Sequence, residues 1–462
     1  MDKPGKSDRV KHLYNRASFG SCYAELKRNA RTPIKTLIKQ LLQQAEKPLP
    51  LLVISAQLPP PDVLRSMSEE AVREYLRQRN RQERELNVRW VETLINTQSP
   101  FLEKMTLFWH GHFACRSNNA FFLQQLNNIH RTNALGNFRT MLVDVSKSAA
   151  MLSFLNNRQN RKAKPNENFA RELMELFTLG RGNYTEKDVK ESARAFTGWQ
   201  FYPPTGEFRF NKSQHDYGVK EFFGKRGNFT GEDIIDMILA KKQTAYFISE
   251  KFYKFFVNDI PDPENVKKLA DVFYDAGYEI KPAIEYLFTA DWFYNRENVG
   301  NKIKSPVEFL VGVGRQFHVN FKNPEVLFPI QRSLGQTLFF PPNVAGWTGG
   351  RSWIDSSTLL TRMKLPSVLL NSGNIDLGAG YDPEDEALVA AQRRNRNAFP
   401  VRIQSNPDWA RFLNEIPDNI SKEELAYLLL APPANPRVAE LQFKSIKDAA
   451  IQLISTPEYQ LC

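Results

Sequence analysis

Residues 165–199 read PNENFARELMELFTLGRGNYTEKDVKESARAFTGW. Apolar side chains recur at helical spacing in the first half of this stretch, at Phe169, Leu173, Leu176 and Phe177. Two glycines at 180 and 182 then end the helix, and Thr185 has the position of an N-cap for a second helix. The stretch therefore predicts two consecutive helices separated by a glycine-rich turn.

The same spacing extends outward in both directions along the chain. It predicts further helices over 68–97, 100–110, 123–134, 138–156, 231–240, 244–258, 263–276, 280–290 and 306–319. Two segments, 198–229 and 334–355, are instead rich in glycine, proline and aromatic residues. We expect a mainly α, large multi-helical globular fold with long ordered Gly/Pro/aromatic loops and at most a short β-hairpin, near Phe208–Phe210. A polar connection is expected at 371–407, before a helical tail.

The composition is that of an ordinary globular protein. The chain has 462 residues, 42% apolar and 24% charged, with a net charge of +11. We divide it into an N-terminal helical region (1–160), a central motif-bearing region (161–370) and a C-terminal region (371–462), or treat it as one continuous domain from about 10 to 462. Three cysteines exclude a disulfide scaffold and a four-cysteine zinc site.

The sequence has no apolar run near the ~18–20 residues that a membrane-spanning helix needs. The N-terminus also lacks the apolar core of a secretory signal, so the chain as written is expected to be cytoplasmic. A periplasmic or envelope location is expected if a leader was trimmed. Nucleic acid is disfavoured as a partner, because no known binding module accompanies the basic residues.

The FWHGHF motif places His110 and His112 one residue apart. If the helix ends at Gly111, the two imidazoles can converge on a metal ion; in a continuous helix they would point about 200° apart. The alternative is that both histidines lie at a helix C-terminus and interact with the helix dipole.

Two further groups of polar residues fall in the central region. Glu172 and Glu175 share one helix face, beside Arg171, which suits general acid–base chemistry or an ion-pair ladder. In the segment QHDYGVK, His215, Asp216 and Lys220 form a set suited to ligand binding or proton transfer.

Tryptophans mark the two aromatic segments. Trp199 opens the first segment, whereas Trp347 and Trp353 lie in the second, FFPPNVAGWTGGRSWI. Such residues form an aromatic platform for a sugar ring, or they fill the protein core.

Common nucleotide-binding, serine-hydrolase and zinc-protease motifs are absent from the sequence. The ordered segments HLYNRASFG, FWHGHFA, 165–199, HDYGVK and LGQTLFFPPNVAGWTGGRSWI together resemble the bacterial family catalogued as domain of unknown function 1800, over nearly the whole chain. The resemblance implies a helical fold, frequent export, and frequent encoding beside a second uncharacterised family that resembles sulfatases and alkaline phosphatases.

Three hypotheses follow from these residues. The first is a metal-dependent enzyme of the hydrolase type. In it His110, His112 and His215, with Asp216 or Glu172, hold a divalent ion (zinc, manganese or iron). Glu172, where it is not a ligand, and Glu175 are the catalytic carboxylates, and Arg171 steers an anionic group. The second is a non-catalytic scaffold whose aromatic loops bind a glycan or a protein. The expected small ligand is a glycan or an anionic small molecule, with Trp199, Trp347, Trp353 and Lys220 as contacts. Under either hypothesis, a protein of the sulfatase-like family is an expected partner. The third hypothesis is nucleic-acid binding.

Overall fold

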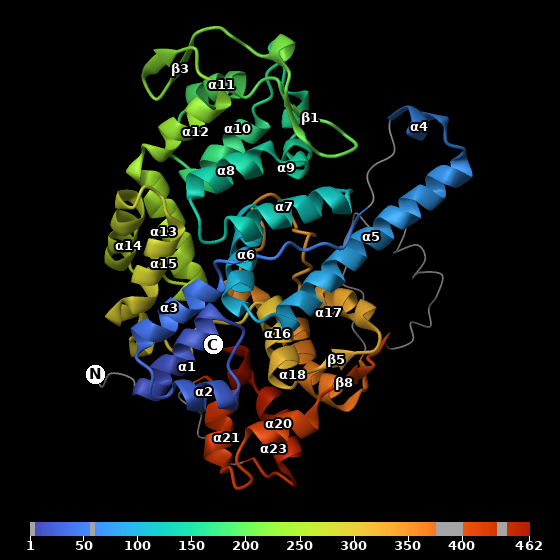
Figure 1. Ribbon diagram of the computed structural model, residues 1–462, viewed down its shortest axis with the longest axis vertical. Coiled ribbons are helices and arrows are strands. Elements are labelled where there is room, and N and C mark those ends of the chain that lie inside the picture. Colours follow the sequence, from blue (N-terminus) through green and yellow to red (C-terminus); the bar gives the residue numbers. More distant parts are fainter. Residues whose placement is uncertain (1–4, 56–60, 376–400, 432–440) are drawn as a thin grey trace.

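The computed structural model describes residues 5–55, 61–375, 401–431 and 441–462, which are mostly helical (Figure 1). The helices of the N-terminal part are α1 (Lys6–Ala17), α2 (Tyr23–Asn29), α3 (Ile34–Gln44), α4 (Pro61–Ser66), α5 (Glu69–Asn96), α6 (Pro100–His112), α7 (Ala120–Thr132), α8 (Phe138–Lys147) and α9 (Ala149–Phe154). Helix α5 projects from the body and carries α4 near its tip (Figure 1).

The central and C-terminal helices include most of those predicted, within a few residues, and two that were not predicted, at 327–334 and 356–371. They are α10 (Asn168–Glu172), α11 (Glu186–Ala195), α12 (Gly231–Leu239), α13 (Lys242–Phe256), α14 (Pro263–Asp275), α15 (Ile280–Thr289), α16 (Pro306–Gln316), α17 (Leu327–Leu334), α18 (Ser356–Asn371), α20 (Trp409–Glu415), α21 (Lys422–Leu429) and α23 (Ile446–Ile454). The mainly α fold class is therefore confirmed.

The strands are short and pair two by two. The expected hairpin is formed by β1 (Trp199–Phe201) and β2 (Phe208–Phe210). A second hairpin joins β3 (Lys220–Phe222) to β4 (Lys225–Gly227), and two further antiparallel pairs join β5 (Asn320–Phe321) to β8 (Ser405–Asn406) and β6 (Asn374–Ile375) to β7 (Val401–Arg402). The sequence analysis missed these three pairs, because strands of two or three residues are too short to show an alternating pattern.

Helix α6 lies between two apolar cores. Phe101 and Trp109 pack into the core formed with α7 to α15, whereas Leu107 packs into the core formed with α5 and α16 to α23. Nearly every side chain of α6 is buried, as expected for a helix that is apolar on all sides. The end of this helix therefore lies deep in the molecule (Figure 1).

Three local differences from the sequence prediction have clear physical reasons. The helix expected over 138–156 is divided at Ser148, whose hydroxyl accepts a hydrogen bond from the Met151 N–H (3.3 Å) and so begins α9. The segment after α10 continues as a π-helix, Leu173–Thr178. Helix α6 does not end at Gly111 but continues to His112, because tertiary packing around it offsets the low helix propensity of glycine.

The polar connection expected at 371–407 lies largely outside the described residues. Within the described part of the chain, no helix combines the length and the apolar character needed to cross a membrane.

Candidate functional site

A cavity of about 910 Å³ opens at the C-terminal end of α6. Its walls come from α6, from the C-terminal half of α13, from the loops around 258–260 and 301–305, and from the segment 345–353. Its volume lies within the range of sites that bind small molecules. The cavity therefore joins parts of the chain that are distant in sequence.

The segment between α17 and α18 packs directly on α6. At Gly346, where φ is +77°, an added Cβ would lie 2.7 Å from the backbone oxygen of Gly111. The Phe339 N–H donates to Nε2 of His110 (3.1 Å), and the ring of Trp347 lies 5.7 Å from that of His110. His110 therefore anchors this segment, and burial lowers its pKa to about 3, which keeps Nε2 an acceptor at neutral pH.

His112 lines the cavity and is only 7% exposed. Its Nε2 lies 3.1 Å from the carbonyl oxygen of Phe177, so this nitrogen carries the proton and donates. Its Nδ1 is buried and has no hydrogen-bond partner among the described residues. Burial, and secondarily the charge of Lys251, lower the pKa of His112, so the imidazole is neutral and Nδ1 is an acceptor.

The charged groups of the cavity are unevenly paired. Lys302 contacts Asp259 (Nζ to Oδ1, 3.1 Å), and Glu308 forms a buried ion pair with Lys104. Lys254 forms an exposed ion pair with Glu250. In contrast, no described carboxylate lies within ion-pair distance of Lys251, whose pKa is lowered by burial and then by Lys254. Lys251 is therefore a partly desolvated cation without an acidic partner.

The two tryptophans of the second aromatic segment both line this cavity. Trp353 is 9% exposed and Trp347 is half-buried. Trp199, which the sequence analysis grouped with them, lies elsewhere. It is 4% exposed and packs edge-on against Phe196 and Phe208, so it is a core residue rather than a ligand contact.

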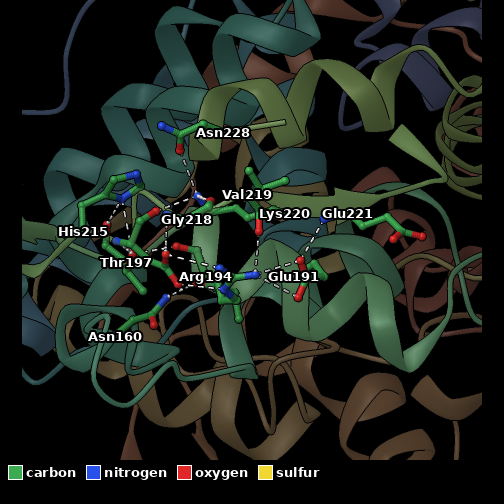
Figure 2. Close-up of polar contacts among 12 residues, drawn as sticks. Asn160, Glu191, Arg194, Thr197, His215, Gly218, Val219, Lys220, Glu221 and Asn228 are labelled. Carbon is green, nitrogen blue, oxygen red and sulfur yellow. Dashed lines mark hydrogen bonds and ion pairs between the residues drawn. The ribbon is translucent and has the colours of Figure 1, made fainter. Parts of the chain in front are cut away.

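His215 and Lys220 lie in a network of polar contacts that holds the first aromatic segment together (Figure 2), and Asp216 joins this network through Arg194 and Lys220. Arg194 donates from Nε to Oδ2 of Asp216 (2.7 Å), and the His215 Nδ1 lies 2.9 Å from the Thr197 carbonyl oxygen. Lys220 is fully buried, and its Nζ donates to the carbonyl oxygens of Asp216 (2.6 Å) and Gly218 (3.1 Å). These polar groups are bound within the loop, so the predicted ligand-binding role of Lys220 is replaced by a structural one.

This network predicts that Asp216→Asn destabilises the protein by about 1–3 kcal/mol, because Arg194 loses a charged acceptor. Burial alone would raise the pKa of Asp216, but Arg194 and the Gly218 N–H lower it overall. Urea unfolding measures the effect, and amide exchange should increase within 198–229. Glu207→Gln, at an exposed carboxylate of the same loop, is the control and should change stability by less than about 0.5 kcal/mol. Equal stability of the two variants would contradict this structural role.

The two predicted catalytic glutamates lie outside the cavity lining, Glu172 on α10 and Glu175 on the π-helix. Arg171 binds both carboxylate oxygens of Glu186 (2.7 and 2.8 Å) and contacts Glu167. Glu175 accepts from the Tyr184 hydroxyl. Burial and then the charge of Glu175 raise the pKa of Glu172. Arg171 and Glu175, however, are engaged in surface interactions.

The predicted metal ligands are not brought together. Within the described ranges, no three His, Cys, Asp or Glu side chains form a group that could hold a metal ion. His110 and His112 point in different directions because α6 remains helical through Gly111. His215 and Asp216 belong to the loop that follows α11, where Arg194 neutralises the carboxylate.

Sequence reasoning missed the cations of the cavity. Lys251 and Lys254 both follow Glu250 on α13 and resemble ordinary solvated lysines in the sequence. Nothing local marks Lys251 as buried, since its burial results from the packing of α13 against distant segments. The two tryptophans, in contrast, were found because glycine and proline mark an irregular segment around them.

The comparisons with known proteins agree with the resemblance noted in the sequence. The model of the family described as "Protein of unknown function (DUF1800)" matches residues 12–461. No curated protein and no solved structure matches this sequence.

Proposed function

Because the chain belongs to the DUF1800 family, whose description names no activity, we propose its function from the cavity: it binds an anionic small molecule, whose charge is held by Lys251. The observation that carries the proposal is that no described carboxylate forms an ion pair with this partly desolvated lysine, because Glu250, whose charge acts on Lys251, is itself paired with Lys254. Removing a charge from water is unfavourable unless an opposite charge compensates it. A bound anion supplies that compensation.

The other charges of the cavity favour an anion as well. Both of its carboxylates, Asp259 and Glu308, already have a lysine partner. The exposed guanidinium of Arg351 adds a further positive group to the same lining. The cavity therefore has an excess of positive charge, which attracts an anion and repels a cation.

The proposal is tested by comparing Lys251→Met with Lys254→Met in the full chain. Inorganic sulfate and phosphate are titrated at constant ionic strength, and the thermal midpoint is followed. We expect both anions to stabilise the wild type, because a ligand present at about 100 times its Kd adds about 2.7 kcal/mol.

The Lys254→Met variant should respond like the wild type, because Lys254 is exposed and paired with Glu250. Lys251→Met should bind the anions about 10 to 100 times more weakly, because it loses the affinity that one charge-assisted hydrogen bond contributes. Its basal stability should be retained or increased, since methionine removes a desolvated charge. An identical anion response in both variants, or none in the wild type, would refute the proposal.

A further inference from the structure

We propose that the first aromatic segment, residues 198–229, docks the protein onto a membrane surface rich in anionic lipids, together with the basic turn at 158–164. The two hairpins of this segment, β1–β2 and β3–β4, lie at one end of the molecule (Figure 1). The residues involved do not line the cavity at α6, so this surface is separate from the anion site proposed above.

Three large apolar side chains of the segment are exposed to solvent. Phe210 is 39% exposed, Tyr217 56% and Val219 60%. The buried ring of His215 lies 5.1 Å from the ring of Phe210 and 4.7 Å from that of Tyr217, so one imidazole holds both rings in neighbouring positions. The carbonyl oxygen of Val219 accepts a hydrogen bond from Arg194 (3.1 Å; Figure 2). The apolar groups are therefore presented by a loop with defined contacts.

The basic turn lies directly beside these side chains. Residues 158–164 read RQNRKAK and contain four bases and no acid, and all four bases are exposed. The Lys162 N–H donates to the carbonyl oxygen of Gln214 (2.8 Å), which places the turn against the aromatic segment. Lys212 adds another exposed base, two residues before Gln214. Apolar and basic side chains are thus combined on one surface.

This combination matches the chemistry of an anionic lipid surface. Anionic headgroups attract clustered lysine and arginine side chains. A tyrosine such as Tyr217 suits the interface, where its ring is shielded from water while its hydroxyl stays hydrated, and Val219 gains free energy by leaving water. The carboxylate of Asp216 is already paired with Arg194 (2.7 Å), so it does not cancel the charge of the basic turn.

A single-stranded nucleic acid would also be attracted by the bases, but it would use the apolar groups differently. Its bases stack on aromatic rings. Val219, the most exposed of the three apolar residues, has no ring, and the rings of Phe210 and Tyr217 already contact His215. A lipid interface accepts aliphatic and aromatic side chains alike. The exposed residues therefore favour a membrane over a nucleic acid.

The test is co-sedimentation of the full chain with lipid vesicles. Vesicles of phosphatidylglycerol and phosphatidylcholine in equal parts are compared with vesicles of phosphatidylcholine alone. We expect the anionic vesicles to bind the protein about tenfold or more tightly, because several exposed bases contribute to the attraction. This preference should decrease as the salt concentration rises, because salt screens exposed charges.

A matched pair of variants tests the apolar contact. Val219→Ser is compared with Leu360→Ser, since Leu360 lies on α18 and is also 60% exposed. Val219→Ser should bind anionic vesicles about fivefold more weakly, because a smaller apolar area leaves water. Leu360→Ser should bind like the wild type. Circular dichroism establishes that both variants are folded.

A second pair tests the charges. Lys162→Gln/Lys164→Gln removes two bases of the turn, and Lys267→Gln/Lys268→Gln removes two exposed lysines of α14 as the control. The first double variant should bind anionic vesicles about fivefold more weakly for each lysine removed. The control should bind like the wild type, although its net charge is the same.

The outcomes that would overturn the inference are specific. Equal binding of the wild type to both kinds of vesicle is one, and equal binding of anionic vesicles by Val219→Ser and Leu360→Ser is another. If labelled oligothymidylate binds the wild type and anionic vesicles do not, the surface serves nucleic acid and the membrane inference is wrong. The sulfate response should be the same in all four variants, so failure of this inference leaves the proposed function intact.

Discussion

Replacing Glu308 by glutamine should destabilise the protein by about 3–5 kcal/mol, because it leaves the ammonium group of Lys104 buried without its counter-ion. Glu308 is 5% exposed and Lys104 is 2% exposed. The lysine lies on α6 and the glutamate on α16, so the pair joins elements that pack into the two apolar cores. Lys104 also donates to the Ser18 carbonyl oxygen (2.9 Å), which cannot replace a full negative charge.

The pH dependence gives a second signature of this pair. Burial alone would raise the pKa of Glu308, but Lys104, Lys302 and the Ser305 N–H lower it to about 2. A carboxyl group whose pKa is lower in the folded state adds stability above its ordinary pKa of 4.5, and this stability is lost as the pH falls toward 2. The glutamine variant should therefore lose stability less steeply between pH 4.5 and 2 than the wild type.

Urea unfolding at pH 7 and at pH 3.5 measures both effects. Glu250→Gln is the matched control, since it removes one carboxylate from an exposed pair with Lys254 and should cost no more than about 1 kcal/mol. The double variant Lys104→Met/Glu308→Leu should be more stable than Glu308→Gln, because it buries no unpaired charge. A double variant that is less stable than the single one would contradict this explanation.

Replacing Gly346 by alanine should cost about 2–5 kcal/mol and displace the segment that forms one wall of the cavity. Two effects combine at this position. Its φ of +77° is unfavourable for a residue with a side chain, and the new Cβ would lie 2.7 Å from the backbone oxygen of Gly111. Because the clashing atom belongs to the backbone of a buried helix, the segment must move rather than the helix.

Gly335→Ala separates these two effects. Gly335 also has a positive φ (+88°), but nothing lies within 4 Å of its added Cβ. It should therefore cost only the ~1–2 kcal/mol of the left-handed backbone. Unfolding experiments compare the two variants, and amide exchange should increase across 336–353 only in Gly346→Ala. The anion response should also weaken only in that variant, because its neighbour Trp347 lines the cavity. Equal losses of stability would show that the close contact with α6 contributes nothing.

The local signals in the sequence were reliable where structure depends on neighbouring residues. The helices α6 and α14 begin at their expected positions, since a proline opens each helix ahead of a periodic apolar pattern. The predicted metal ligands do not form a group in the described structure; at Gly111 the local preference of glycine indicated a helix end, whereas packing keeps the helix intact.

Residues with similar sequence contexts acquired different roles through packing. His110 accepts a backbone N–H from a segment more than 200 residues away, whereas Nδ1 of His112 is buried without a hydrogen-bond partner in the described part of the chain. Lys251 and Lys254 lie three positions apart on α13, yet among the described residues only Lys254 forms an ion pair with a carboxylate, that of Glu250.

The amino-acid order alone therefore specifies a helical protein with two irregular aromatic segments, because periodicity, caps and turn residues act over a few positions. The packing of α6, α13 and the segment 345–353 specifies which charged groups are desolvated and which ring nitrogens are left without a hydrogen-bond partner. Burial depends on surfaces contributed by distant parts of the chain, so no local pattern contains that information.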